Sequence, residues 1–246
     1  MHTSPVIVLL RGLIRSRFHW GEFPQRFSEE FTVIETELPG NGYRFSEQTP
    51  SSIQDMMTVL RDDVRKQHTG PVILIAISMG GMIASEWAKQ YPNEVLQLHL
   101  INTSLANLSL PWQRMNALAF FRFLGALGSV DRLEKGILDL TINHGVQEDM
   151  SEHWLTFAKS HPLQWRNIFT QLAAASRYRG PVQAPIQNAW LYNSTCDRLV
   201  RPECSEIIAK RWQKPLTSHP TAGHDLPIDD PDWLENAIRE KITLAR

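Results

Sequence analysis

Short apolar runs rich in β-branched residues recur along the chain, and most of them are followed by a stretch with helical periodicity. Runs such as VIVLL and VILIA are apolar without interruption, which is typical of strands covered on both faces of a sheet. Strands alternating with helices in this way predict right-handed crossovers, and therefore a doubly wound, mostly parallel α/β sheet of about six strands. Strands are expected at Val6–Leu10, Thr32–Thr36, Val72–Ala76, Val95–Ile101, Ile186–Tyr192 and Leu216–His219, and helices at Ser51–Gln67, Gly80–Gln90, Pro202–Gln213 and Pro231–Leu244.

One interval interrupts this alternation, because residues 104–179 show helical periodicity without a convincing strand. Roughly 75 residues between two strands is much longer than an ordinary crossover connection. The interval is also rich in aromatic residues, Trp112 among them. The sequence therefore predicts an α/β core formed by residues 1–103 and 180–246, with an inserted helical cap over 104–179. A run of ordinary crossover helices is the alternative.

The composition is that of an ordinary globular chain. Hydrophobic residues make up 42% and charged residues 21% of the 246 positions, and the formal net charge is −1. A charge balance this close to zero, without a long run of Lys and Arg, argues against a nucleic-acid partner. The apolar run Val6–Leu10 is too short for a signal peptide, and no segment reaches the roughly 18 apolar residues of a membrane span. We therefore expect a cytoplasmic protein with a small-molecule substrate and no nucleic-acid or membrane partner, and the sequence does not indicate its oligomeric state.

The strongest chemical signal is Ser78, which follows a buried apolar run and directly precedes a helix that starts with small residues. A serine on a sharp strand-to-helix turn is the pattern of a nucleophile elbow. Small neighbours are needed because the turn brings the two backbones close together: Gly80 fits, whereas Ala76 stands where a first glycine is usual. The N–H of Met79 would point from the helix start towards a developing oxyanion. A serine that ends a strand by chance is the alternative.

The loop after the first predicted strand offers a second oxyanion donor. Gly12 permits a turn there, and the N–H of Leu13 is the candidate donor. Arg11 stands where many hydrolases carry histidine, and it either supports the loop or binds an anionic group of the substrate, of which we favour the structural role. Arg11, Trp20 and Trp112 are the candidate substrate contacts.

His224 is singled out among nine histidines by its place in the chain. It follows Gly223 in a loop between the last predicted strand and the terminal helix, where a base has the freedom to lean over the sheet edge. An imidazole with the ordinary pKa of about 6.5 can take the serine proton and later deliver it to the leaving group. Asp229, Asp230 and Asp232 come after the histidine and are expected to cap the terminal helix.

Asp197 is the candidate acid behind the histidine. It lies just beyond the predicted strand Ile186–Tyr192. An acid there can bond the other imidazole nitrogen and stabilise the imidazolium that forms. A turn-forming aspartate is common and is the alternative, but the order Ser78, Asp197, His224, with each residue just beyond a strand, is much less common.

Taken together, these residues resemble the α/β-hydrolase superfamily. The resemblance rests on Arg11-Gly12, Leu38–Gly42, the Ser78 turn, Asp197–Pro202 and Gly223-His224, and it covers nearly the whole chain. Glu37 stands where the family usually carries aspartate, and the chain starts almost directly on the family's third strand, so the leading hairpin is expected to be missing. The chain looks most like small capped carboxylesterases such as the pimeloyl-ester hydrolases. That likeness implies cleavage of a carboxylic ester or thioester of a small to medium, partly apolar substrate through an acyl-enzyme.

Several alternatives stay open at this point. Other relatives in the superfamily are acyltransferases, lactonases or C–C hydrolases, and a ligand-binding protein could keep the fold without turnover. Relatives with an aspartate nucleophile are disfavoured because position 78 is serine. The sequence contains no metal-ligand cluster and no phosphate-binding glycine loop, so neither a metal nor a cofactor is expected.

Overall fold

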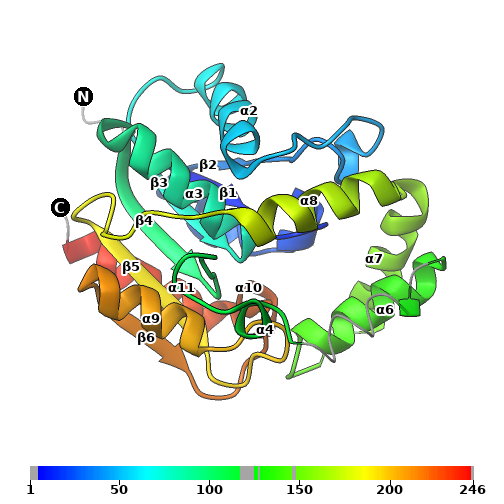
Figure 1. Cartoon of the computed structure of the whole chain (residues 1–246). Helices are drawn as coiled ribbons and strands as arrows, with labels where there is room; N and C mark the ends of the chain where they lie inside the picture. Colours follow the sequence, from blue (N-terminus) through cyan, green and yellow to red (C-terminus); the bar gives the residue numbers. More distant parts are fainter. Residues whose placement is uncertain (1–4, 117–124, 127, 146–147, 245–246) are drawn as a thin grey trace.

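A parallel sheet forms the centre of the computed structural model, which describes residues 5–116, 125–126, 128–145 and 148–244 (Figure 1). Within those residues the sheet has six strands in the order β2-β1-β3-β4-β5-β6, and each neighbouring pair is parallel. The predicted doubly wound α/β sheet is therefore confirmed. The strands are β1 (Val6–Leu10), β2 (Thr32–Glu35), β3 (Val72–Ile77), β4 (Val95–Ile101), β5 (Ala189–Ser194) and β6 (Leu216–His219).

The strand β5 differs most from its prediction, since it begins at Ala189 and continues to Ser194. Its last two residues are polar, yet both are fully buried. Asn193 donates its side-chain amide to Pro202 O, and the backbone N–H of Ser194 donates to Asn102 Oδ1. Polar residues with such partners extend the strand beyond its apolar run, and the hydrophobic pattern alone does not contain that information.

Alternate strand residues face two different helical layers. Val8 and Leu74 pack towards one side, against α2 (Ile53–Arg65), α3 (Met79–Gln90) and α9 (Glu203–Trp212). Leu9 and Ile75 pack towards the other side, against α1 (Gln25–Ser28), α10 (Leu226–Asp229) and α11 (Pro231–Leu244). Two apolar faces of this kind require a helical layer on each side of the sheet. The core also contains the short 3-10 helices η1 (Arg17–Trp20), η2 (Gly42–Arg44) and η3 (Pro92–Glu94).

Between β4 and β5 the described residues form helices and no strand. They are α4 (Pro111–Arg114), α6 (Val130–Thr141), α7 (Glu148–Ser160) and α8 (Trp165–Arg177). In Figure 1, α6 and α7 lie beside the core, and α8 runs back to it. This arrangement is compatible with a helical cap, whose limits at residues 104 and 179 stay a prediction. None of the helices in the described part of the chain is long and apolar enough to cross a membrane.

The helix α8 is attached to the core by buried amide side chains. Asn167 accepts a hydrogen bond from Thr49 N at 3.0 Å. Gln171 accepts one from Ile14 N at 2.8 Å and donates one to Asn41 Oδ1 at 2.7 Å. Buried amides with satisfied partners fix one orientation of a helix more strictly than apolar contacts do. The helix therefore holds the loop that follows β1, where the second oxyanion donor is predicted.

Candidate active site

Ser78 occupies a strained turn between β3 and α3. Its backbone angles are φ 56° and ψ −121°, which a residue other than glycine rarely adopts. The conformation is held from both sides, because Ser78 N donates to Ile101 O at 2.8 Å and Thr103 Oγ1 donates to Ser78 O at 2.7 Å. Strain of this kind persists where the surroundings determine it, and it is concentrated at functional sites.

The small residues around Ser78 serve different purposes. A Cβ added to Gly80 would lie 2.3 Å from Leu10 O, so α3 can start this close to the end of β1 only with glycine there. Ala76 lies inside β3, opposite Leu10 and Leu100, and is fully buried. The core accommodates its methyl group, so the departure from the usual motif leaves the turn intact.

His224 and Asp197 meet beyond the ends of β6 and β5. His224 Nδ1 lies 2.6 Å from Asp197 Oδ2, and the two side chains are 6% and 1% exposed. The other carboxylate oxygen, Oδ1, accepts the N–H groups of Leu199 at 2.8 Å and Val200 at 2.9 Å. Because an ionised carboxylate only accepts, Nδ1 carries the proton and Nε2 keeps a free lone pair. His224 is therefore in the tautomer that a base needs.

Two hollows meet at Ser78. The smaller one, a cavity of about 70 Å³, is also lined by Gly12, Leu13 and His224. The larger one, a cleft of about 750 Å³, is also lined by Leu13, Met79 and Trp112. No hydrogen bond joins Ser78 Oγ to His224 within the described part of the chain, and such bonds are often long in ligand-free sites. The structure thus brings Ser78, His224 and both predicted oxyanion residues to one place.

The loop after β1 approaches the nucleophile closely. A Cβ added to Gly12 would lie 3.1 Å from Ser78 Cβ, so a side chain there would crowd the serine. Among the hydrogen bonds of the described residues, none is donated by the backbone N–H of Leu13 or of Met79. Both groups are therefore available to an oxygen beside Ser78, as the predicted oxyanion role requires.

The contacts of Arg11 support the structural role that the sequence analysis favoured. Its guanidinium forms two hydrogen bonds with Asp225, at 2.9 and 2.6 Å, and both side chains are 4% exposed. It also lies over the Trp20 ring, 4.8 Å from the ring centroid. Although Arg11 lines the small cavity, its charge is already neutralised by Asp225, which argues against an anionic substrate group there.

The two tryptophans predicted as substrate contacts have different positions. Trp20 has no exposed surface, stacks on Phe23 in the core and lines neither hollow at Ser78, so its predicted contact with substrate is not supported. Trp112 is 57% exposed and lines the cleft, so its substrate contact stays a prediction.

Residues that the sequence analysis missed also support the site. Asn102, with φ 45°, donates its side-chain amide to His224 O at 2.8 Å. The available signal was its place just after β4, because the carboxyl ends of parallel strands meet at one edge.

The aspartates after the histidine have two different roles. Asp230 caps α11 as predicted, because it accepts a hydrogen bond from Trp233 N at 3.1 Å. Asp229 instead accepts hydrogen bonds from backbone N–H groups next to His224. No group of three or more His, Cys, Asp and Glu side chains in the described residues is arranged to hold a metal ion.

A family model and several curated relatives match the sequence. Residues 7–237 match the model of the alpha/beta hydrolase family. A pimeloyl-[acyl-carrier protein] methyl ester esterase of Hamiltonella defensa is 34% identical over 97 residues, which are 39% of this chain and 36% of that protein. The chain spans about a third of the length of the curated relatives that it matches.

Solved structures share the fold over the whole chain. A membrane phospholipase A has a TM-score of 0.81 at 19% identity, covering 100% of this chain and 81% of that one. The 2-hydroxy-6-oxo-6-phenylhexa-2,4-dienoate hydrolase of Rhodococcus sp. strain RHA1 has a TM-score of 0.79 at 17% identity, covering 98% and 88%. With a family model that spans nearly all of the sequence and a sheet of the matching topology, the chain belongs to the alpha/beta hydrolase family.

Proposed function

We propose that this protein is a serine hydrolase that cleaves a carboxylic ester or thioester of a small to medium, partly apolar substrate through an acyl-enzyme. The observation that carries the proposal is the strained Ser78 turn at the junction of two hollows, beside a histidine that Asp197 holds in the basic tautomer. The name of the Hamiltonella relative, a methyl ester esterase, supports an ester as substrate.

The reaction follows from these positions. His224 Nε2 takes the proton of Ser78 Oγ, which attacks the carbonyl carbon of the substrate. The oxyanion that forms lies between the N–H groups of Leu13 and Met79, and the loss of one such donor commonly costs about 3 kcal/mol of barrier stabilisation. His224 then protonates the departing alkoxide or thiolate, leaving an acyl group on Ser78. Water, activated by the same histidine, releases the acid.

The two hollows support an orientation for the substrate. The leaving group must lie next to His224, which lines the cavity of about 70 Å³. A single water needs about 10–15 Å³ on this scale, so the cavity holds an alcohol of a few carbons. The cleft of about 750 Å³ is mostly apolar, with Met82, Leu172 and Trp112 in its wall, and suits an acyl chain. We therefore favour an ester of a small alcohol with a longer apolar acid.

A fluorophosphonate probe tests the chemistry. The wild-type protein should be labelled at Ser78, and Ser78→Ala should stay unlabelled. Ser104→Ala is the matched control, because Ser104 lines the same cleft without lying on the strained turn, and it should be labelled like the wild type. A folded wild-type protein that resists the probe would indicate a ligand-binding protein and would contradict the proposal.

Two isomeric esters test the orientation. Methyl octanoate and heptyl acetate contain the same atoms, but the long chain is on the acyl side in one and on the alcohol side in the other. We expect kcat/KM to be higher for methyl octanoate by at least about tenfold, which corresponds to about 1.4 kcal/mol. Faster cleavage of heptyl acetate would reverse the assignment of the two hollows.

A further inference from the structure

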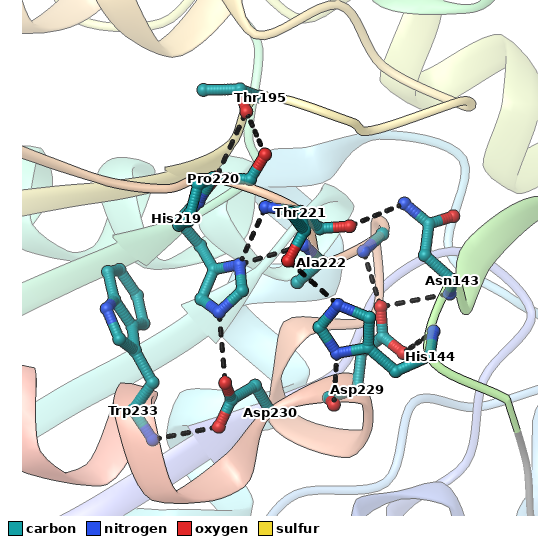
Figure 2. Close-up of polar contacts among 11 residues, drawn as sticks. Asn143, His144, Thr195, His219, Pro220, Thr221, Ala222, Asp229, Asp230 and Trp233 are labelled. Carbon is teal, nitrogen blue, oxygen red and sulfur yellow. Dashed lines mark hydrogen bonds and ion pairs between the residues drawn. The ribbon is translucent and has the colours of Figure 1, made fainter.

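The end of α6 lies between the loops that carry Asp197 and His224. We call residues 141–144 the cap junction. Asn143 donates its side-chain amide to Cys196 O and to Thr221 O, both at 3.0 Å. Cys196 directly precedes Asp197, and Thr221 is in the short segment that leads to His224. One amide group therefore connects the acid loop with the histidine loop, and Figure 2 shows it facing Thr221.

Asp229 connects the same junction to the histidine from the other side. Its carboxylate accepts the N–H groups of Gly223, Asn143 at 2.9 Å and His144 at 2.7 Å (Figure 2). Three backbone donors on one buried carboxylate form charge-assisted bonds, which are stronger than neutral ones. Gly223 directly precedes His224, so Asp229 fixes the backbone from which the imidazole projects.

The junction also contacts the residue that follows the histidine. Asp225 N donates to Thr141 O at 2.8 Å. A Cβ added to Gly223 would lie 2.4 Å from Thr141 O, so glycine is required for the junction to come this close. Of the two neighbours of His224 in the sequence, Asp225 is thus bonded to the end of α6 and Gly223 lies against it.

We propose that Asn143 and Asp229 are positioning residues that hold the two loops in the register that forms the 2.6 Å contact between His224 and Asp197. This inference rests on the proposed function. Neither residue lines the cavity or the cleft at Ser78, so both act through His224 rather than on the substrate. Thr141 does line the cavity, and α6 therefore connects substrate contact to the alignment of the base.

Two isosteric variants test the proposal. Asn143→Asp keeps the size of the side chain but places an acceptor opposite the carbonyls of Cys196 and Thr221. Asp229→Asn keeps the size but removes the charge and one acceptor. We expect each variant to lower kcat by about tenfold or more, with KM changed by less than about twofold, because alignment of the base matters most in the transition state. Fluorophosphonate labelling should slow in parallel.

The strongly deshielded proton of the short His224–Asp197 hydrogen bond gives a second readout, by proton NMR, that needs no turnover. It should be present in the wild type and lost or shifted in both variants. Asn107→Asp is the matched control, because Asn107 also donates its amide to a carbonyl, Gly180 O at 3.0 Å, and neither residue lines the cavity or the cleft at Ser78. The control should keep the wild-type proton signal and kcat.

The possible outcomes separate the inference from the proposed function. A wild type that shows the deshielded proton but takes no label contradicts hydrolysis, and the NMR signal of the variants still decides the positioning role. Variants that lose thermal stability yet keep kcat and the proton signal overturn the inference. If Asn143→Asp does not fold, Asn143→Ala, which removes the two donated bonds without adding a charge, is measured in its place by the same criteria.

Discussion

Gly80 and Gly223 bring backbones together in the candidate site. An added Cβ would lie 2.3 Å from Leu10 O at Gly80 and 2.4 Å from Thr141 O at Gly223, and neither glycine has a positive φ. Freedom of the loop was the expected reason for a glycine before His224. The structure gives a different reason, which is the close approach of the cap junction to the histidine loop.

Replacing Gly80 with alanine should destabilise the protein, because both acceptors that its methyl group would meet, Leu10 O and Arg11 O, are backbone atoms. We expect a loss of about 1–3 kcal/mol in the free energy of unfolding, measured with urea. Gly136→Ala in α6 is the matched control: among the described residues its Cβ would meet only Ala126, at 4.0 Å, so it should gain up to about 1 kcal/mol from helix propensity. Equal effects of both variants would contradict the argument.

The carboxyl group of Glu37 makes the stability of the protein depend on pH. Burial raises the pKa of its carboxyl from 4.5 to about 7, although Ser16 Oγ donates to Oε2 at 2.7 Å. A raised pKa in the folded state means that the proton favours folding. The contribution of Glu37 to stability is therefore fully present below pH 4.5 and is lost as the pH rises through about 7.

Glu37→Gln should remove this dependence. A shift from 4.5 to about 7 corresponds to about 3 kcal/mol at most, so the variant should gain up to that amount relative to wild type between pH 5 and pH 8. Urea unfolding at the two pH values measures the difference. The same substitution at exposed Glu29 serves as control and should show no such gain. If the difference in unfolding free energy between wild type and Glu37→Gln is the same at both pH values, the raised pKa of Glu37 is contradicted.

At the scale of elements, α8 supports the oxyanion loop through one side chain. Gln171→Leu would leave the Ile14 N–H buried without its acceptor, next to the proposed donor Leu13. We expect a loss of about 1–3 kcal/mol in unfolding free energy, together with a lower kcat. Gln54→Leu, on the exposed side of α2, is the matched control and should change neither quantity. Unchanged kcat in Gln171→Leu would show that α8 does not determine the loop.

The elements that the sequence predicts well are those whose pattern is local. The bounds of β1, β4 and β6 were predicted to the residue; β1 is an uninterrupted apolar run, as is typical of a strand covered on both faces, whereas β4 and β6 also contain polar residues. The short helices η1 and α1 were not predicted, since a single turn leaves no periodic signal. The attachment of α8 was also missed, because the role of Gln171 depends on which groups lie opposite it in space.

At the scale of the whole molecule, the site is built from segments far apart in the sequence. The positions of Ser78, Asp197 and His224 followed from chain order and strand ends, which a parallel sheet brings to one edge. The contacts of Asn143 and Asp229 did not, because they join the inserted helices to two separate loops of the core. Partners across such a junction leave no spacing in the sequence from which they could be inferred.

A buried ion pair joins the inserted helices to the core. Arg15, in the loop after β1, lies 2.6 Å from Glu134 of α6, and both side chains are 7% exposed. Glu134→Leu alone would leave the Arg15 charge buried without a partner and should cost about 3–5 kcal/mol of unfolding free energy. The double variant Arg15→Met with Glu134→Leu removes both charges, so it should be at least about 2 kcal/mol more stable than Glu134→Leu.

Urea unfolding of the two single variants and the double variant measures this coupling. Asp131→Asn is the control for an exposed pair: Asp131 lies 2.8 Å from Lys159, but both side chains are more than half exposed, so stability should hardly change. If the loss of unfolding free energy in the double variant equals the sum of the losses in the two single variants, the two residues are not coupled, and the argument for a buried ion pair is contradicted. If the double variant recovers stability but its kcat stays low, the ion pair is needed to order the loop that carries Leu13. The inserted helices would then contribute to the site by holding that loop in place.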